Sequence, residues 1–177
     1  MKRTLGALVV KELLLLRHGK SDWNADYGKD RERPLAPRGK AAAKLIGRFL
    51  KKTNSVPDLV VTSSALRACS TAQLAAEAGG WSSRLVVTDN LYASSSGTVL
   101  KLISRQAKGV ERLMLVGHNP TWEDTIRLLI GGGMIRVPTA TIACIRFPIL
   151  SWNDASAGSG VLQWLVTPKL LKKGGVR

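Results

Sequence analysis

The chain has 177 residues, the length of one ordinary domain. Hydrophobic residues make up 45% and charged residues 22%, so the chain can bury a sizeable core and is not intrinsically disordered. The 27 Lys and Arg residues exceed the 12 Asp and Glu residues by 15. This balance favours an anionic partner: nucleic acid, an acidic membrane or a phosphorylated substrate.

The two cysteines, Cys69 and Cys144, belong to no CxxC motif and to no Cys/His cluster. A disulfide framework or a structural zinc site is therefore not expected. Both cysteines lie in apolar stretches, which predicts buried thiols in a reducing compartment.

The amino end carries a basic start at residues 1–3 and an apolar run at 5–10, which the charged pair at 11–12 interrupts. The run is too short for a signal peptide, and no segment approaches the ~20 apolar residues of a membrane span. We expect a flexible extension over residues 1–10, a cytoplasmic location and no membrane partner.

In the first part of the chain, short apolar runs alternate with segments of helical periodicity. The apolar runs predict strands buried on both faces, and apolar residues spaced three and four apart predict helices. Ser63 or Ser64 is expected to cap the second helix, and Gly79 and Gly80 to end it. The predicted elements are a strand at 13–16, a helix at 37–52, a strand at 59–62, a helix at 65–78, a strand at 85–87 and a helix at 98–107.

The second part continues this alternation and then changes it. Thr121 and Asp124 have the spacing of a capping box at the start of a helix, which three glycines at 131–133 end. The last two strands are expected to pair as a hairpin and to add antiparallel edges to the sheet. The remaining predicted elements are strands at 113–116, 141–147 and 161–167 and a basic, fraying tail at 169–177.

Strand–helix alternation with short connections predicts an α/β protein. We expect a three-layer sandwich with a mainly parallel central sheet and helices on both faces. Residues 11–168 are expected to form the single domain.

The two histidines of the chain occupy equivalent places. His18 and His118 each follow a four-residue apolar strand segment, at 13–16 and 113–116, and each has a glycine beside it. Ligands of open α/β sheets bind at the carboxyl ends of the strands. The pattern therefore favours a functional site that contains both imidazoles over two unrelated structural histidines.

Two arginines are predicted at the same edge. Arg17 precedes His18, and Arg67 lies in the first turn of the helix after the second strand, where the helix dipole disfavours a cation. Two guanidinium groups, two imidazoles and a helix N-terminus are the groups that bind a phosphoryl group. Neutral imidazole can also attack phosphorus.

These residues resemble those of a known family. The blocks that match are Leu-Leu-Leu-Arg-His-Gly-Lys-Ser-Asp-Trp at 14–23, Arg-Pro-Leu at 33–35, Arg-Gly at 38–39, Ser-Ser-Ala-Leu-Arg-Ala at 63–68 and Val-Gly-His-Asn-Pro at 116–120. They closely resemble the histidine phosphatase superfamily, which is phosphoglycerate mutase-like in fold, and within it the small phosphohistidine phosphatase branch of SixA type. The resemblance runs from about residue 11 to residue 166.

The resemblance implies a role for each matching residue. His18 is expected to be the nucleophile that forms a phosphohistidine intermediate, and Arg17, Arg67 and His118 to bind the phosphoryl oxygens. Asn24 matches an asparagine that contacts the phosphate or the substrate in the mutase-like branch. No metal and no cofactor are implied, and the partner is a phosphorylated substrate such as a phosphohistidine protein.

The general acid is the missing part of this pattern. Mutase-like enzymes carry a glutamate after the third strand, and this chain has none there. The remaining candidates are Asp22, Asp26, Asp30 and Asp89. An imidazole leaving group needs less protonation than an alcohol does, so the gap favours phosphohistidine as the substrate.

Two other functions compete with this prediction. A mutase or a sugar-phosphate phosphatase would need a deep lid and a nearby glutamate, and neither is visible in a chain of this length. A polyanion- or nucleic-acid-binding protein would use the positive charge, but the tryptophans are scattered and do not interleave with the basic residues.

Overall fold

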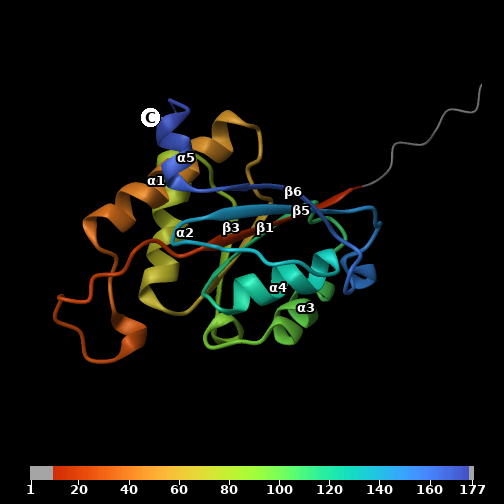
Figure 1. Cartoon of the computed structure of the whole chain (residues 1–177), viewed down its shortest axis with the longest axis horizontal. Coiled ribbons are helices and arrows are strands. Elements are labelled where there is room, and N and C mark those ends of the chain that lie inside the picture. Colours follow the sequence, from red (N-terminus) through yellow and green to blue (C-terminus); the bar gives the residue numbers. More distant parts are fainter. Residues whose placement is uncertain (1–9, 176–177) are drawn as a thin grey trace, which may run out of the picture.

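A computed structural model describes residues 10–175 of the chain (Figure 1). Six strands form one sheet in the order β3-β2-β4-β1-β5-β6. The first four of these strands are parallel to one another, and β5 and β6 are antiparallel to their neighbours. The strands are β1 (Lys11–Arg17), β2 (Leu59–Ser63), β3 (Arg84–Thr88), β4 (Arg112–Gly117), β5 (Ile142–Phe147) and β6 (Val161–Val166).

Helices cover both faces of the sheet (Figure 1). Three short 3₁₀ helices connect the main elements: η1 (Asp30–Glu32), η2 (Asp89–Leu91) and η3 (Trp152–Asp154). The α-helices are α1 (Pro37–Lys52), α2 (Leu66–Gly79), α3 (Ser96–Ser104), α4 (Thr121–Ile130) and α5 (Pro168–Lys173).

Strand β1 explains how a continuous apolar run builds two cores. Successive side chains of a strand point to opposite faces of the sheet. Leu13 and Leu15 belong to the core under α3 and α4, whereas Leu14 and Leu16 belong to the core under α1, α2 and α5, and all four are fully buried. The predicted three-layer α/β fold, with the late antiparallel hairpin, is therefore confirmed.

Two predicted helix caps are wrong. Helix α2 begins at Leu66 with Ala65 at its N-cap position. The hydroxyl of Ser63 contacts His118 and the backbone N–H of Ala65, and the hydroxyl of Ser64 donates to Asp89. Helix α4 has Pro120 at its N-cap position. Thr121 donates its hydroxyl to the carbonyl of Ser94 and so forms no capping box.

Three further differences come from tertiary contacts or local capping. Ser95 caps α3, which runs over 96–104 instead of 98–107. Part of the predicted tail forms α5, because Leu171 is buried in the core beneath α1 and α2. Cys144 is buried, and desolvation raises its pKa to about 12, but Cys69 is only half-buried.

The expected N-terminal extension lies outside the described residues except for Val10. Over residues 10–175, no helix has the length and apolar character needed to cross a membrane.

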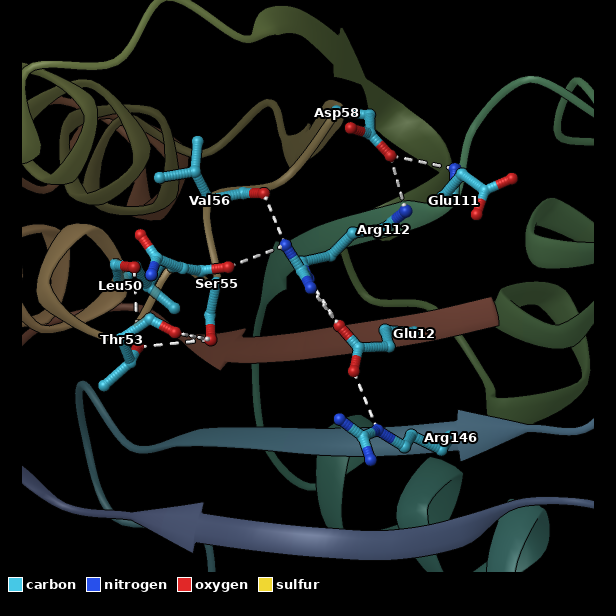
Figure 2. Close-up of polar contacts among 10 residues, drawn as sticks. Glu12, Leu50, Thr53, Ser55, Val56, Asp58, Glu111, Arg112 and Arg146 are labelled. Atoms are coloured by element: carbon cyan, nitrogen blue, oxygen red, sulfur yellow. Dashed lines mark hydrogen bonds and ion pairs between the residues drawn. The ribbon is translucent and has the colours of Figure 1, made fainter. Parts of the chain in front are cut away.

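Where β1 and β4 begin and the antiparallel β5 ends, Glu12, Arg112, Arg146 and Asp58 form a cluster of paired charges (Figure 2). The carboxylate of Glu12 accepts from Arg112 at 2.5 Å and from Arg146 at 2.7 Å. Arg112 also donates to the carbonyl of Val56, and its backbone N–H donates to the carboxylate of Asp58. Glu12 is opposite both arginines in the sheet register, so one carboxylate joins β1, β4 and β5.

Candidate active site

A cavity of about 410 Å³ opens at the carboxyl ends of the parallel strands. Strands β1, β2, β3 and β4 each lead into a segment that contributes to it. Four of the five predicted site residues line this cavity: Arg17, His18, Arg67 and His118. Asn24 is exposed and is not among the lining residues, and its backbone N–H donates to Asp22.

His18 is held by the backbone on both sides. Its N–H donates to the carbonyl of Gly117 on β4, and its carbonyl accepts from Ala140. The side chain is 8% exposed, and Nδ1 lies 2.7 Å from the carbonyl oxygen of Gly19. Because a carbonyl oxygen can only accept, Nδ1 carries the hydrogen, and the lone pair of the ring is on Nε2.

Both imidazoles are neutral at pH 7. Burial is the main cause that lowers the pKa of His18 to about 3; the nearby cations Arg67 and Arg17 act in the same direction, and the hydrogen bond to Gly19 acts against it. Burial, followed by the charge of Arg67, lowers the pKa of His118 to about 4. A neutral imidazole keeps its lone pair, which a nucleophile requires.

The two imidazoles are neighbours, with ring centroids 5.0 Å apart. Nε2 of His118 shares a hydrogen bond of 2.9 Å with the hydroxyl of Ser63, the last residue of β2. The ring of Tyr92 stands edge-on to His118 at 6.0 Å between centroids. Strands β1, β2 and β4 and the segment after β3 thus fix the geometry around one point.

Trp122 contacts the ends of both strands that lead to the histidines, β1 and β4. Its indole N–H donates to the carbonyl of Leu16, two residues before His18, at 2.8 Å. Its ring packs so closely on Gly117, the residue before His118, that a Cβ at this glycine would lie 2.8 Å from a ring carbon. Glycine is therefore required at position 117 by a close approach of the two elements.

Hydrogen bonds connect helix α2, which carries Arg67, to Gly19, the residue after His18. The N–H of Gly19 donates to the hydroxyl of Thr71, which itself donates to the carbonyl of Arg67 one turn earlier. The guanidinium of Arg67 is thereby brought to the cavity that holds His18.

The arginines of the site keep part of their donor capacity free. Arg17 donates to the carbonyl of Val137, and Arg67 donates both to the backbone carbonyl and to the carboxylate of Asp30. Among residues 10–175, the buried Nε atoms of Arg17, Arg33 and Arg67 have no partner. Buried donors are normally satisfied, so three such groups around one cavity indicate an anion-binding site.

Asp30 is the one candidate acid that lines the cavity. Its carboxylate accepts from Arg33 at 2.6 Å, from Arg67 at 2.9 Å and from the hydroxyl of Tyr92 at 3.2 Å. Burial acts to raise the pKa of Asp30, but the hydrogen bonds from Arg33 and Arg67 outweigh it and lower the pKa. Asp30 is therefore ionised at neutral pH and holds no proton to donate.

The other candidate acids are engaged elsewhere or exposed. Asp89 pairs with Arg31 and accepts from Ser64, and Asp22 accepts from the backbone of Asn24. Asp26 is exposed. Over the described range, no group of three or more His, Cys, Asp or Glu side chains is arranged to hold a metal ion.

Sequence reasoning assigned no role in the site to four lining or supporting residues: Arg33, Ser63, Tyr92 and Trp23. Tyr92 could have been found, because it follows shortly after the end of the third predicted strand. Arg33 lies in an irregular segment, where its guanidinium stacks on the indole of Trp23 at 3.5 Å from the ring centroid. No periodicity marks such a contact.

The fold and this site define the class of protein. The family model of the histidine phosphatase superfamily (branch 1) matches residues 13–108, and the chain belongs to this superfamily. The matched range includes Arg17, His18 and Arg67. Membership supports a phosphatase, which acts on a phosphorylated substrate.

Known relatives give the particular resemblance. The chain is 32% identical to an uncharacterised protein of Mycobacterium tuberculosis over 164 residues, which are 87% of this chain and all of that protein. It is 28% identical to an uncharacterised chloroplastic protein of Arabidopsis thaliana over 165 residues, which are 88% of this chain and 75% of that protein. A 2,3-bisphosphoglycerate-dependent phosphoglycerate mutase of Bifidobacterium longum is 44% identical over 69 residues, 38% of this chain and 28% of the mutase.

Solved structures show the same architecture. A protein from Agrobacterium tumefaciens described as phosphohistidine phosphatase SixA is 30% identical, with a TM-score of 0.75 over 89% of this chain and 98% of that one. The protein histidine phosphatase SixA complexed with tungstate is 23% identical and shares the fold, with a TM-score of 0.78 over 90% and 99% of the two chains. The expected resemblance to the SixA type is thus confirmed.

Proposed function

We propose that the protein is a metal-independent phosphatase of SixA type that hydrolyses phosphohistidine or a small phosphomonoester through a phosphohistidine intermediate on His18. The observation that carries the proposal is the hydrogen bond between Nδ1 of His18 and the carbonyl of Gly19. It places the lone pair on Nε2 of a buried, neutral imidazole that guanidinium groups surround.

The reaction has two displacements at phosphorus. In the first, the Nε2 lone pair of His18 forms a bond to phosphorus while the bond to the leaving group breaks with its electron pair. In the second, the oxygen of a water molecule attacks phosphorus, the bond to Nε2 breaks, and the released proton goes to solvent or phosphate. Arg17, Arg67 and His118 would bind the equatorial oxygens, where charge accumulates.

The ionised state of Asp30 favours a leaving group that needs no acid. A leaving alkoxide requires a proton, and a positioned general acid supplies typically 10²–10⁴-fold in rate. A phosphohistidine whose other ring nitrogen is protonated releases a neutral imidazole. We therefore expect a higher kcat/KM for phosphohistidine and aryl phosphates than for alkyl phosphates.

The nucleophile is tested by trapping the intermediate. Brief incubation with ³²P-labelled phosphohistidine protein and rapid quenching should give an acid-labile, base-stable label on His18. His18→Ala should abolish the label, whereas the matched variant His118→Asn should still form it, more slowly. A chelator should leave the rate unchanged. A label on any other residue contradicts the assignment.

The mutase-like alternative is supported by the local 44% identity to phosphoglycerate mutase. It predicts turnover of sugar phosphates or phosphoglycerates as fast as that of phosphohistidine. Equal kcat/KM values for the two kinds of substrate would replace the SixA-type proposal by this alternative.

A further inference from the structure

A second depression, of about 520 Å³, adjoins the active-site cavity. Lys20 and Thr139 line both. Four cationic side chains line the second depression, and no described Asp or Glu residue does. We call it the basic groove and define it by Lys20, Arg38, Lys169 and Lys172.

The fold places these cations close to the segment that follows His18. The carbonyl of Lys20, two residues after His18, accepts from Ala36 just before α1, and α1 approaches so tightly that a Cβ on Gly39 would lie 2.1 Å from that carbonyl oxygen. Arg38 is in the first turn of α1. Helix α5, which carries Lys169 and Lys172, contacts α1.

Thr139, which also lines the groove, is next to a residue that hydrogen-bonds to His18. Thr139 precedes Ala140, whose backbone N–H donates to the carbonyl of His18. A ligand lying in the basic groove would therefore lie beside the phosphoryl group that His18 attacks.

The charges of the groove are not neutralised within the described part of the chain. Lys20, Arg38, Lys169 and Lys172 make no ion pair or side-chain hydrogen bond with any residue in 10–175. Arg31, Arg112 and Arg146, by contrast, each contact a carboxylate. Four like charges around one depression repel one another, and this favours an anionic occupant.

We propose that the basic groove binds an acidic polypeptide segment next to the phosphorylated residue of a protein substrate; this proposal rests on the proposed phosphatase activity. The groove is larger than the catalytic cavity, so an occupant of both is larger than a small phosphomonoester. Its lysines are flexible point charges, which suit carboxylates spaced along a chain better than one fixed phosphate.

The residues that line the groove also favour a polypeptide over a nucleic acid as its ligand. Proteins that bind single-stranded nucleic acid stack the bases on aromatic side chains. Among the described residues, no aromatic side chain lines the basic groove. Its uncharged lining residues, which include Ala42 and Pro138, offer no surface on which bases could stack.

The test compares two phosphohistidine peptides of equal length. One carries four Asp or Glu residues beside the phosphohistidine, and the other carries Asn or Gln at the same places. Both are assayed with the full chain, with Lys169→Gln/Lys172→Gln, and with the matched control Lys101→Gln/Lys108→Gln, whose exposed lysines lie on α3 and just after it, at the opposite face of the sheet. Arg38→Gln on α1 is a second groove variant.

The acidic peptide should have a kcat/KM about tenfold higher at low salt, since each exposed ion pair changes affinity by a factor of about 1.5 to 5. The advantage should fall with salt, disappear in the Lys169/Lys172 variant, decrease in Arg38→Gln and persist in the control. Turnover of p-nitrophenyl phosphate should stay unchanged in all three variants, which shows that they are folded.

Equal kcat/KM values for the two peptides, or equal losses in the groove and control variants, would overturn the proposal. So would tighter binding of an oligonucleotide of equal charge than of the unphosphorylated acidic peptide, measured by fluorescence anisotropy. Binding of that acidic peptide without turnover of any phosphorylated compound would instead refute the proposed phosphatase and leave the groove assignment standing.

Discussion

The two ends of the central strands use arginine in opposite ways. At the edge where β1 and β4 begin and the antiparallel β5 ends, Arg112 and Arg146 both donate to Glu12. Burial acts to raise the pKa of this carboxyl, but the net effect with the contacts of Arg146 and Arg112 is to lower it. At the carboxyl ends, three arginines and two imidazoles gather around a cavity whose one described carboxylate is that of Asp30.

The difference shows how one residue type serves structure at one edge and binding at the other. All three guanidinium nitrogens of Arg112 are engaged, by Glu12 and by the backbone carbonyls of Asn54 and Val56. Arg17 and Arg67 instead keep a buried, unpartnered Nε among the described residues. Folding leaves these donors unsatisfied, and an anion would satisfy them.

Removing a cation from the carboxyl edge should have the largest effect on activity. Arg67→Ala should lower kcat/KM by about 10²–10³-fold, the usual loss for one donor to a developing anion. Arg67→Lys should recover part of the loss, because it restores the charge but not the planar fork. Steady-state kinetics with p-nitrophenyl phosphate measures both variants. A loss below tenfold for Arg67→Ala would place this arginine outside the phosphoryl site.

Breaking the paired cluster at the amino edge should change stability and not catalysis. Glu12→Gln leaves two arginines without their shared carboxylate, whose side chain is 13% exposed, and should lower the free energy of unfolding by about 2–3 kcal/mol. Asp124→Asn, which breaks the exposed Asp124–Arg127 pair, should cost less than about 1 kcal/mol. Urea unfolding measures both. A change in kcat/KM of more than about twofold for Glu12→Gln would contradict the separation of the two edges.

The pH dependence of stability should report the buried imidazoles. The pKa of His18 in the folded chain, about 3, is below the value of 6.5 expected after unfolding, so the unfolded state binds more protons in this range. The free energy of unfolding should therefore fall as the pH falls below 6.5. His18→Asn should reduce the fall between pH 6.5 and 5.5 by roughly 1 kcal/mol. Identical pH profiles for this variant and the native chain would show that His18 titrates normally.

The smallest effect is expected from the phenol at the cavity rim. Tyr92→Phe removes the hydrogen bond of 3.2 Å to Asp30 but keeps the ring that packs beside His118 and under Arg31. We expect a loss of about twofold to threefold in kcat/KM. A much larger loss would make the Tyr92 hydroxyl a direct contact of the substrate.

Much of the fold follows from local sequence, and the site follows in part. The apolar runs before His18 and His118 identified two neighbouring strands, and the position of ligand sites in α/β sheets then brought both imidazoles to one edge. The same rule applied to Arg67, since α2 begins three residues after β2.

The parts that were missed depend on contacts between distant segments. Ser63 cannot be recognised as a partner of His118 instead of a helix cap until β2 and β4 are paired. Asp30 was a candidate general acid, but its contacts with Arg33 and Arg67 were not predicted, because Arg67 is 37 residues away from Asp30 in the sequence. Helix α5 exists because Leu171 reaches the core, which its own basic sequence does not indicate.

The pairing of β1 with β4 has a consequence for how the chain becomes active. Leu13 lies beside Leu113 in the register, so the two histidine-bearing strands meet only by closing a loop of about 100 residues. Such contacts form late in folding, since the loss of chain entropy precedes the gain in packing. During synthesis, a nascent chain that ends before β4 holds His18 without His118. The cavity that both imidazoles line is therefore completed only after β4 has been synthesised and has paired with β1.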